Sequence, residues 1–143
     1  MEYKLTILGR LDGLNEYTAA NRTNPYKGGK MKQENEDTVI WQIRQQLRGV
    51  HITKPVIIYY RFFEPNSRRD NDNILSGATK FIQDSLVKTK ILVDDNQKCI
   101  PKFYFDTFVD KKNPRIELTI TELTNEQAGM KLVDLLKNLE AGG

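Results

Sequence analysis

Cysteine and histidine are nearly absent from this chain of 143 residues, which holds only Cys99 and His51. One cysteine excludes a disulfide within the chain, and the two residues cannot supply a thiolate zinc site or a dyad of two histidines. A Cys99–His51 nucleophile pair remains open, although neither residue stands in a recognisable nucleophile motif. The simpler interpretation is a partly buried thiol and a surface histidine.

Long hydrophobic runs are missing as well. No apolar stretch approaches the roughly 18 residues that a membrane span needs, and Lys4, Arg10 and Asp12 interrupt the apolar core that a signal peptide would have. A hydrophobic content of 38% and a charged content of 29% are typical of soluble globular proteins. We therefore expect one domain over residues 1–143, located in the cytoplasm and without membrane contact.

Acidic residues are missing from the segment 17–33, although the net charge of the whole chain is only +3. The positive charges of this segment are Arg22, Lys27, Lys30 and Lys32. Glycine and asparagine are frequent between them, so we expect a flexible basic loop. Such a loop suits contact with the phosphates of a nucleic acid. A solvated loop without a partner explains the same composition.

Hydrophobic periodicity predicts strands and helices in alternation. Strands are expected at 3–11, 56–63, 103–109 and 115–123, and helices at 33–48, from 72 to about 89, and from 124 onward. The segment 110–114 is expected to join the last two strands as a hairpin. The order of the elements indicates an α+β fold in which helices flank a mixed sheet.

Carboxylates gather in two short clusters along this order. Asp70 and Asp72 follow the second predicted strand, and Asp94 and Asp95 follow the next helix. Like charges this close are costly unless a cation relieves them. If the backbone is extended at 70–72, the first two carboxylates project on the same side, roughly 6.5 Å apart. They are then placed to share a divalent metal ion.

A third carboxylate normally bridges the ions of a two-metal phosphoryl site. Asp94 or Asp95, returned by the intervening helix, could supply it. Because neighbouring side chains of an extended segment point to opposite faces, only one of the two is expected to face the metal. The alternative is that Asp72 or Asn71 caps the helix and that no metal is bound.

These residues resemble the RusA family of Holliday junction resolvases, small endonucleases found largely in bacteria and their prophages. The resemblance rests on the motif Asp70-x-Asp72-Asn73, a helix that carries Lys80 and Asp84, and the pair Asp94-Asp95, in this order. It covers about residues 4–123, including the pattern at 9–15 and the strand that ends at 118–122. The predicted helix at 125–140 is left over as a C-terminal extension of this RusA-like domain.

The resemblance implies a homodimer that hydrolyses phosphodiesters at four-way DNA junctions, in recombination and repair. The cofactor would be Mg²⁺, for which Mn²⁺ can substitute. Asp70, Asp72 and one aspartate of the pair, Asp95 ahead of Asp94, are implied as metal ligands. A water activated by the metal would be the nucleophile, which agrees with a chain so poor in cysteine and histidine.

A catalytic lysine in the helix after the motif is also implied. In the family it lies one turn after the second aspartate, where this chain has Ser76. Lys80 lies two turns on, and one inserted turn, at Gly77 for example, would bring the two patterns into agreement. We assign the lysine role to Lys80, which would offset negative charge on the scissile phosphate.

Two neighbouring arginines, Arg68 and Arg69, are predicted to grip phosphates beside the acidic cluster. Two other functions stay open. The chain could be a nucleic-acid-binding module without catalysis, or a Mg²⁺-dependent enzyme that acts on a nucleotide. A binding module has no need for clustered acids against DNA, and an enzyme of small phosphates has little need for the basic segment. The two features together favour the nuclease.

Overall fold

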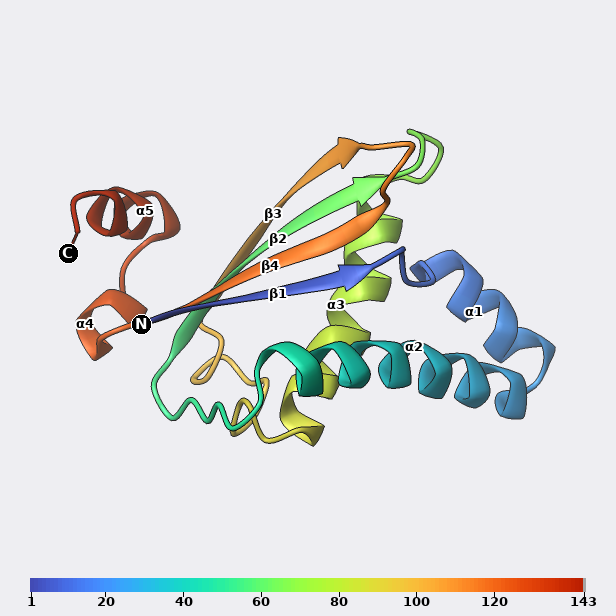
Figure 1. Cartoon of the computed structure of the whole chain (residues 1–143), viewed down its shortest axis with the longest axis horizontal. Helices are drawn as coiled ribbons and strands as arrows, with labels where there is room; N and C mark the ends of the chain where they lie inside the picture. Colours follow the sequence, from blue (N-terminus) through green and yellow to red (C-terminus); the bar gives the residue numbers. More distant parts are fainter. Residues whose placement is uncertain (143) are drawn as a thin grey trace.

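A computed structural model describes residues 1–142 and shows one four-stranded sheet with helices packed on it (Figure 1). Strand β1 (Glu2–Leu8) precedes helices α1 (Leu14–Thr23) and α2 (Pro25–Gln46). Strand β2 (Val56–Glu64), helix α3 (Asn71–Lys88) and strands β3 (Lys102–Val109) and β4 (Arg115–Glu122) follow. Helices α4 (Asn125–Ala128) and α5 (Leu132–Glu140) come last. The predicted α+β fold with a mixed sheet is confirmed.

The strands lie in the order β1-β4-β2-β3. Strand β2 pairs with β3 in parallel and with β4 antiparallel, and β4 also pairs antiparallel with β1. The hairpin predicted between the last two strands is therefore wrong, because β3 and β4 lie on opposite sides of β2. The nearly continuous apolar run of β2 makes it a central strand with a partner on each side.

Helices α1, α2 and α3 cover one face of the sheet, and the main core lies between the two layers (Figure 1). Alternate residues of the strands point into it, as expected for a sheet with one buried face. Among the fully buried side chains are Leu5, Ile7, Ile58, Tyr60, Phe62, Ile116, Leu118 and Ile120. None of the helices formed by residues 1–142 combines the length and apolar character that a membrane crossing requires.

The basic segment is helical, which corrects the predicted flexible loop at 17–33. Asn24 ends α1 and caps α2, where its Oδ1 accepts the backbone N–H of Lys27 at 2.7 Å and Pro25 opens the helix. Gly28 serves close packing, since a Cβ there would lie 1.8 Å from Oδ1 of Asn21. Helix α2 consequently begins eight residues before the predicted 33–48 helix.

The C-terminal segment begins with the predicted capping box, in which Thr124 and Gln127 exchange side-chain and backbone hydrogen bonds. The single helix expected from there breaks into α4 and α5 around Gly129. Helix α5 buries Leu135 against Ile57, on the sheet face that α1, α2 and α3 leave open. The segment thus covers one end of this second face.

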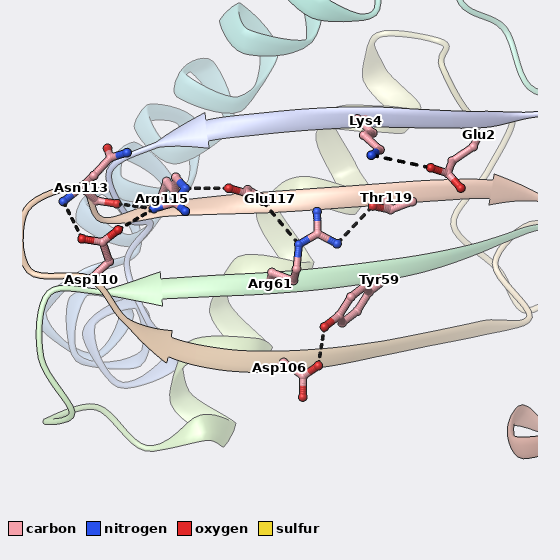
Figure 2. A network of polar contacts seen from close by, with 10 residues as sticks. All are labelled: Glu2, Lys4, Tyr59, Arg61, Asp106, Asp110, Asn113, Arg115, Glu117 and Thr119. Atoms are coloured by element: carbon pink, nitrogen blue, oxygen red, sulfur yellow. Dashed lines mark hydrogen bonds and ion pairs between the residues drawn. The ribbon is translucent and has the colours of Figure 1, made fainter. Parts of the chain in front are cut away.

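The rest of the second face carries a polar network centred on Arg115 (Figure 2). Its guanidinium donates to Glu117 Oε2 at 2.6 Å and to Asp110 Oδ2 at 2.9 Å, and lies 3.7 Å from the ring centroid of Phe63. Arg61 donates to Oε1 of the same Glu117 at 3.4 Å. The cations of this face are thus largely neutralised by their neighbours.

We expect Arg115 to determine part of the acid sensitivity of the fold. Its hydrogen bonds hold the pKa of Glu117 below 4.5 and that of Asp110 below 3.8, the ordinary values. A carboxyl with a lowered folded-state pKa contributes stability that is present above its unfolded pKa and is lost as the pH falls through the folded value. Thermal unfolding of wild type and Arg115→Gln should therefore differ most near neutral pH and converge below about pH 4. A difference that stays constant with pH would contradict this.

Candidate functional site

A buried ion pair anchors the loop that leads to the first acidic cluster. Arg69 donates from Nε to Glu64 Oε1 at 2.8 Å and from Nη2 to Oε2 at 2.9 Å. The two side chains are only 11% and 5% exposed. Arg69 also donates to the carbonyl oxygen of Leu11 at 2.9 Å, which ties the loop to the segment after β1. Such bidentate pairs have a fixed geometry, so the position of the next residue, Asp70, is well defined.

Asp70 and Asp72 lie at the N-terminus of α3. Asp70 is the N-cap residue with an extended backbone, and Asp72 belongs to the first helical turn. The prediction that Asp72 or Asn71 caps the helix is wrong by one or two residues, and the backbone is not extended through 70–72 as assumed. Both aspartates are exposed, and they line a shallow hollow of about 410 Å³ with Leu14, Asn15, Asn71 and Asn73.

The start of α1 forms the other side of this hollow, because α1 and α3 meet there at very short range. Asn73 Oδ1 accepts the backbone N–H of Asn15 at 2.7 Å. A Cβ on Gly13 would lie 2.7 Å from the Asn73 amide, and one on Gly77 would lie 2.5 Å from the carbonyl oxygen of Asp12. Only glycine at these two positions allows the contact, so the N-termini of two helices border the site.

The chemistry of the hollow suits a hard cation. Within residues 1–142, neither the Asp70 nor the Asp72 carboxylate takes part in a side-chain hydrogen bond or ion pair that the structure shows, so all four oxygens are uncommitted. Exposed carboxylates of this kind are the ligands that Mg²⁺ uses, with waters and substrate phosphates in its remaining positions. Among the same residues, however, no group of three or more His, Cys, Asp or Glu side chains could hold a metal ion.

Asp94 and Asp95 lie at the other end of α3. This helix is continuous from Asn71 to Lys88, and the twelve residues from Asp72 to Asp84 span about 18 Å. Partial desolvation raises the pKa of Asp95, and a hydrogen bond with Asp94 and the negative charge of Asp84 raise it further. The second cluster therefore neighbours Asp84, and one chain does not bring it to Asp70 and Asp72.

An ion-pair cluster occupies the region of Asp84 instead. Lys32 Nζ lies 3.2 Å from Asp84 and 3.6 Å from Glu36, and Lys88 pairs with the same Glu36, whose side chain is 2% exposed. Asp94 accepts the backbone N–H of Asp95 at 2.7 Å, so it organises its own turn. Lys32 and Asp94 thus have structural partners, which the sequence did not indicate.

Arg22, Lys27 and Lys30 are exposed cations near the junction of α1 and α2, the two helices that form a helical hairpin. Lys30 lies 4.0 Å from Glu34, and the structure shows no ion pair for the other two within residues 1–142. This hairpin extends beyond the sheet at the end where α3 begins (Figure 1). The helical hairpin and the hollow therefore lie on the same side of the molecule.

The remaining predicted site residues differ in their surroundings. Arg68 is exposed beside Asp70, whereas Arg69 is committed to Glu64 and is not free to grip a phosphate. Lys80 is exposed on α3, with Nζ 6.0 Å from the ring centroid of Tyr17. Helix α3 runs through Gly77 without interruption, and the inserted turn relative to the family pattern stays a prediction.

Fold and site together define an α+β protein with an acidic hollow where two helices begin. Comparison of the chain with models of known protein families gives no match, and comparison with curated proteins gives none either. The resemblance to RusA resolvases therefore rests on the quoted motifs alone and stays a prediction.

Adjacent arginines of the loop before α3 provide a matched test of the anchor. Arg69→Gln removes one partner of a buried ion pair, which typically costs about 3 kcal/mol of unfolding free energy. Arg68→Gln changes the same charge at an exposed position and should stay within about 0.5 kcal/mol of wild type. Urea unfolding followed by circular dichroism measures both. Equal effects of the two substitutions would show that the Glu64–Arg69 pair does not anchor the loop.

Proposed function

We propose that this protein is a Mg²⁺-dependent endonuclease of branched DNA, with four-way junctions as its preferred substrate, and that it acts in the cytoplasm as a homodimer. The observation that carries the proposal is the pair of uncommitted carboxylates, Asp70 and Asp72, at one exposed hollow. Their order along the chain with Asn73 and the second aspartate pair, in the pattern of RusA resolvases, supports the same reaction.

Asp70 and Asp72 would hold the metal in this proposal. Mg²⁺ is commonly bound by one or two carboxylates together with substrate phosphates, so two aspartates are sufficient. When bound, the ion supplies Lewis acidity to the phosphodiester and helps a water to lose its proton; Mn²⁺ offers the same chemistry. The N-termini of α1 and α3 favour negative charge nearby, both on the aspartates and on a phosphate.

The cations around the hollow would position the DNA. Arg68 lies beside Asp70, where it is free to contact a phosphate next to the scissile one. Arg22, Lys27 and Lys30 on the helical hairpin extend the positive surface away from the hollow. Lys80 lies about 12 Å along α3 from Asp72, two helical turns away. We therefore assign Lys80 to phosphate binding rather than to the reacting phosphate.

A nucleic-acid-binding module without catalysis is the second candidate. The separation of Asp94 and Asp95 from the hollow favours it, because a third carboxylate that could bridge two metal ions is not brought there within one chain. Both candidate functions assign nucleic-acid binding to the basic helical hairpin, but only the nuclease requires Asp70 and Asp72 to bind a metal ion. Measurements of cleavage and of binding on the same variants distinguish them.

Cleavage of a synthetic four-way junction, compared with linear duplex of matched sequence, tests the nuclease directly. Incision should require Mg²⁺ or Mn²⁺ and should favour the junction. Asp70→Asn and Asp72→Asn should each lower the cutting rate by at least about 100-fold, since even partners of metal ligands are worth 10–100-fold. Binding of the junction should persist, because removing negative charge does not repel DNA.

Asp37→Asn provides the control for these variants, as it makes the same change at an exposed position of α2. Asp95→Asn should reduce cutting far less than Asp70→Asn; an equal loss would mean that a second copy supplies Asp95 to the hollow. Normal cutting by Asp70→Asn and Asp72→Asn would sink the proposed metal centre. Junction binding without metal-dependent incision by wild type would establish the binding module instead.

The salt dependence of junction binding tests the helical hairpin. Each phosphate contact contributes about 0.9 to the slope of log affinity against log salt concentration on duplex DNA. Alanine at Arg22, Lys27 and Lys30 together should therefore reduce the slope by nearly 3, as measured by fluorescence anisotropy. Alanine at the exposed Lys54, Lys98 and Lys137, which lie on other segments, is the matched control. Equal slopes for the two triple variants would exclude the hairpin from the interface.

A further inference from the structure

The two edges of the sheet differ. Edge strand β1 is blocked near its centre by α2, where Gln46 accepts the backbone N–H of Thr6 and donates to its carbonyl oxygen, both at 2.7 Å. Among residues 1–142, edge strand β3 pairs only with β2, and Figure 2 shows it as the outermost strand of the sheet. Its outer row of backbone N–H and C=O groups is thus open to another strand.

Apolar side chains accompany this open edge. Phe103 and Phe108 are both 44% exposed, and Val109 is 61% exposed. Phe103 and Phe105 extend the helix-covered face, where they contact Tyr60 and Phe62 edge-on. A long edge strand with exposed aromatic residues readily pairs with a further strand.

The sequence of β3 is nearly symmetric about Tyr104: it reads Lys-Phe-Tyr-Phe-Asp from 102 to 106. If a second copy pairs antiparallel with its own Tyr104 on the two-fold axis, Phe103 lies opposite Phe105 of the second copy. Lys102 then lies opposite Asp106 of the second copy, and each of these pairs occurs twice. Residues directly opposite in antiparallel strands share a face, and opposite charges and aromatic pairs stabilise there.

We propose that β3 is the interface of the homodimer proposed above and that it joins two four-stranded sheets into one sheet of eight strands. The occupant of the edge is a second copy because the strand complements itself in both charge and shape. Asp106 can serve both contacts: its Oδ2 accepts the Tyr59 hydroxyl, and its Oδ1 is free for the ammonium group of Lys102 of the second copy.

Other registers fit less well. If each chain shifts by one residue, Phe105 lies on the axis. Lys102 then lies opposite Phe108 of the second copy, and Tyr104 lies opposite its Asp106. A further shift opposes the two Asp106 carboxylates to each other, which is destabilising. Pro101, which has no N–H to donate, ends the pairing at the start of the strand. The Tyr104-centred register is therefore the favourable one.

The arrangement has a consequence for the hollows. A two-fold axis between antiparallel edge strands is perpendicular to the sheet, so the helical layers of both copies lie on the same side. The Asp70–Asp72 pairs of the two copies consequently belong to the same layer of the dimer and lie at opposite ends of the paired strands. The assembly itself does not depend on the proposed chemistry, and its test needs no activity.

Sedimentation velocity on the full chain over a range of concentrations tests the interface. Wild type should dimerise. Lys102→Glu and Asp106→Lys should each raise the dissociation constant about tenfold, because two attractive pairs become repulsive. An equimolar mixture of the two variants should associate as tightly as wild type, since each chain then meets the opposite charges.

Lys4→Glu, the same charge change on edge strand β1, should leave the dimer unaltered and is the control. Circular dichroism checks each fold. The double variant Lys102→Glu/Asp106→Lys must dimerise like wild type. If Asp106→Lys unfolds because it loses the Tyr59 contact, the sensitivity of the dimer to Lys102→Glu decides the test. A monomeric wild type overturns the proposal. So does a dimer that is insensitive to Lys102→Glu, or a weakened dimer that neither the mixture nor the double variant restores.

Discussion

The buried pair of Glu64 and Arg69 is the interaction on which the candidate site depends. Glu64 is the last residue of the central strand, and Arg69 immediately precedes the first aspartate. A buried carboxylate is costly unless it is paired and hydrogen-bonded, and here both oxygens accept from one guanidinium. The same guanidinium binds the carbonyl oxygen of Leu11. The sheet, the loop before α3 and the segment before α1 are thereby held together at one point.

Close packing of backbone completes this arrangement. Gly13 and Gly77 permit α1 and α3 to meet at distances that any Cβ would prevent, and Gly28 does the same between α1 and α2. Asn73 is buried between α1 and α3, and its Oδ1 accepts the backbone N–H of Asn15 at the start of α1. Two helix N-termini and two aspartates are thus gathered without a dedicated binding loop, which explains how a shallow and exposed hollow still has a defined shape.

Much of the fold could be predicted from local pattern, but less of the site. The alternation in β4, the continuous apolar run of β2 and the capping box at Thr124 each indicate their element correctly, because each signal depends on neighbours in sequence. The predicted hairpin between β3 and β4 is wrong because strand partners depend on how the whole sheet is buried, and β2 lies between these two strands. The composition of the basic segment predicts a loop, whereas its glycine at position 28 serves packing against Asn21, a contact that no local pattern reveals.

The amino-acid sequence alone establishes the chemical inventory: two aspartates before a helix, two after it, a basic segment without acids, and almost no cysteine or histidine. Which of these groups meet depends on the tertiary packing. The rigid rod of α3 separates Asp84, the neighbour of Asp95, from Asp72 by about 18 Å along its axis, and burial commits Arg69 to Glu64. Side-chain types can be read from the chain, but distances across it depend on how rigid elements pack.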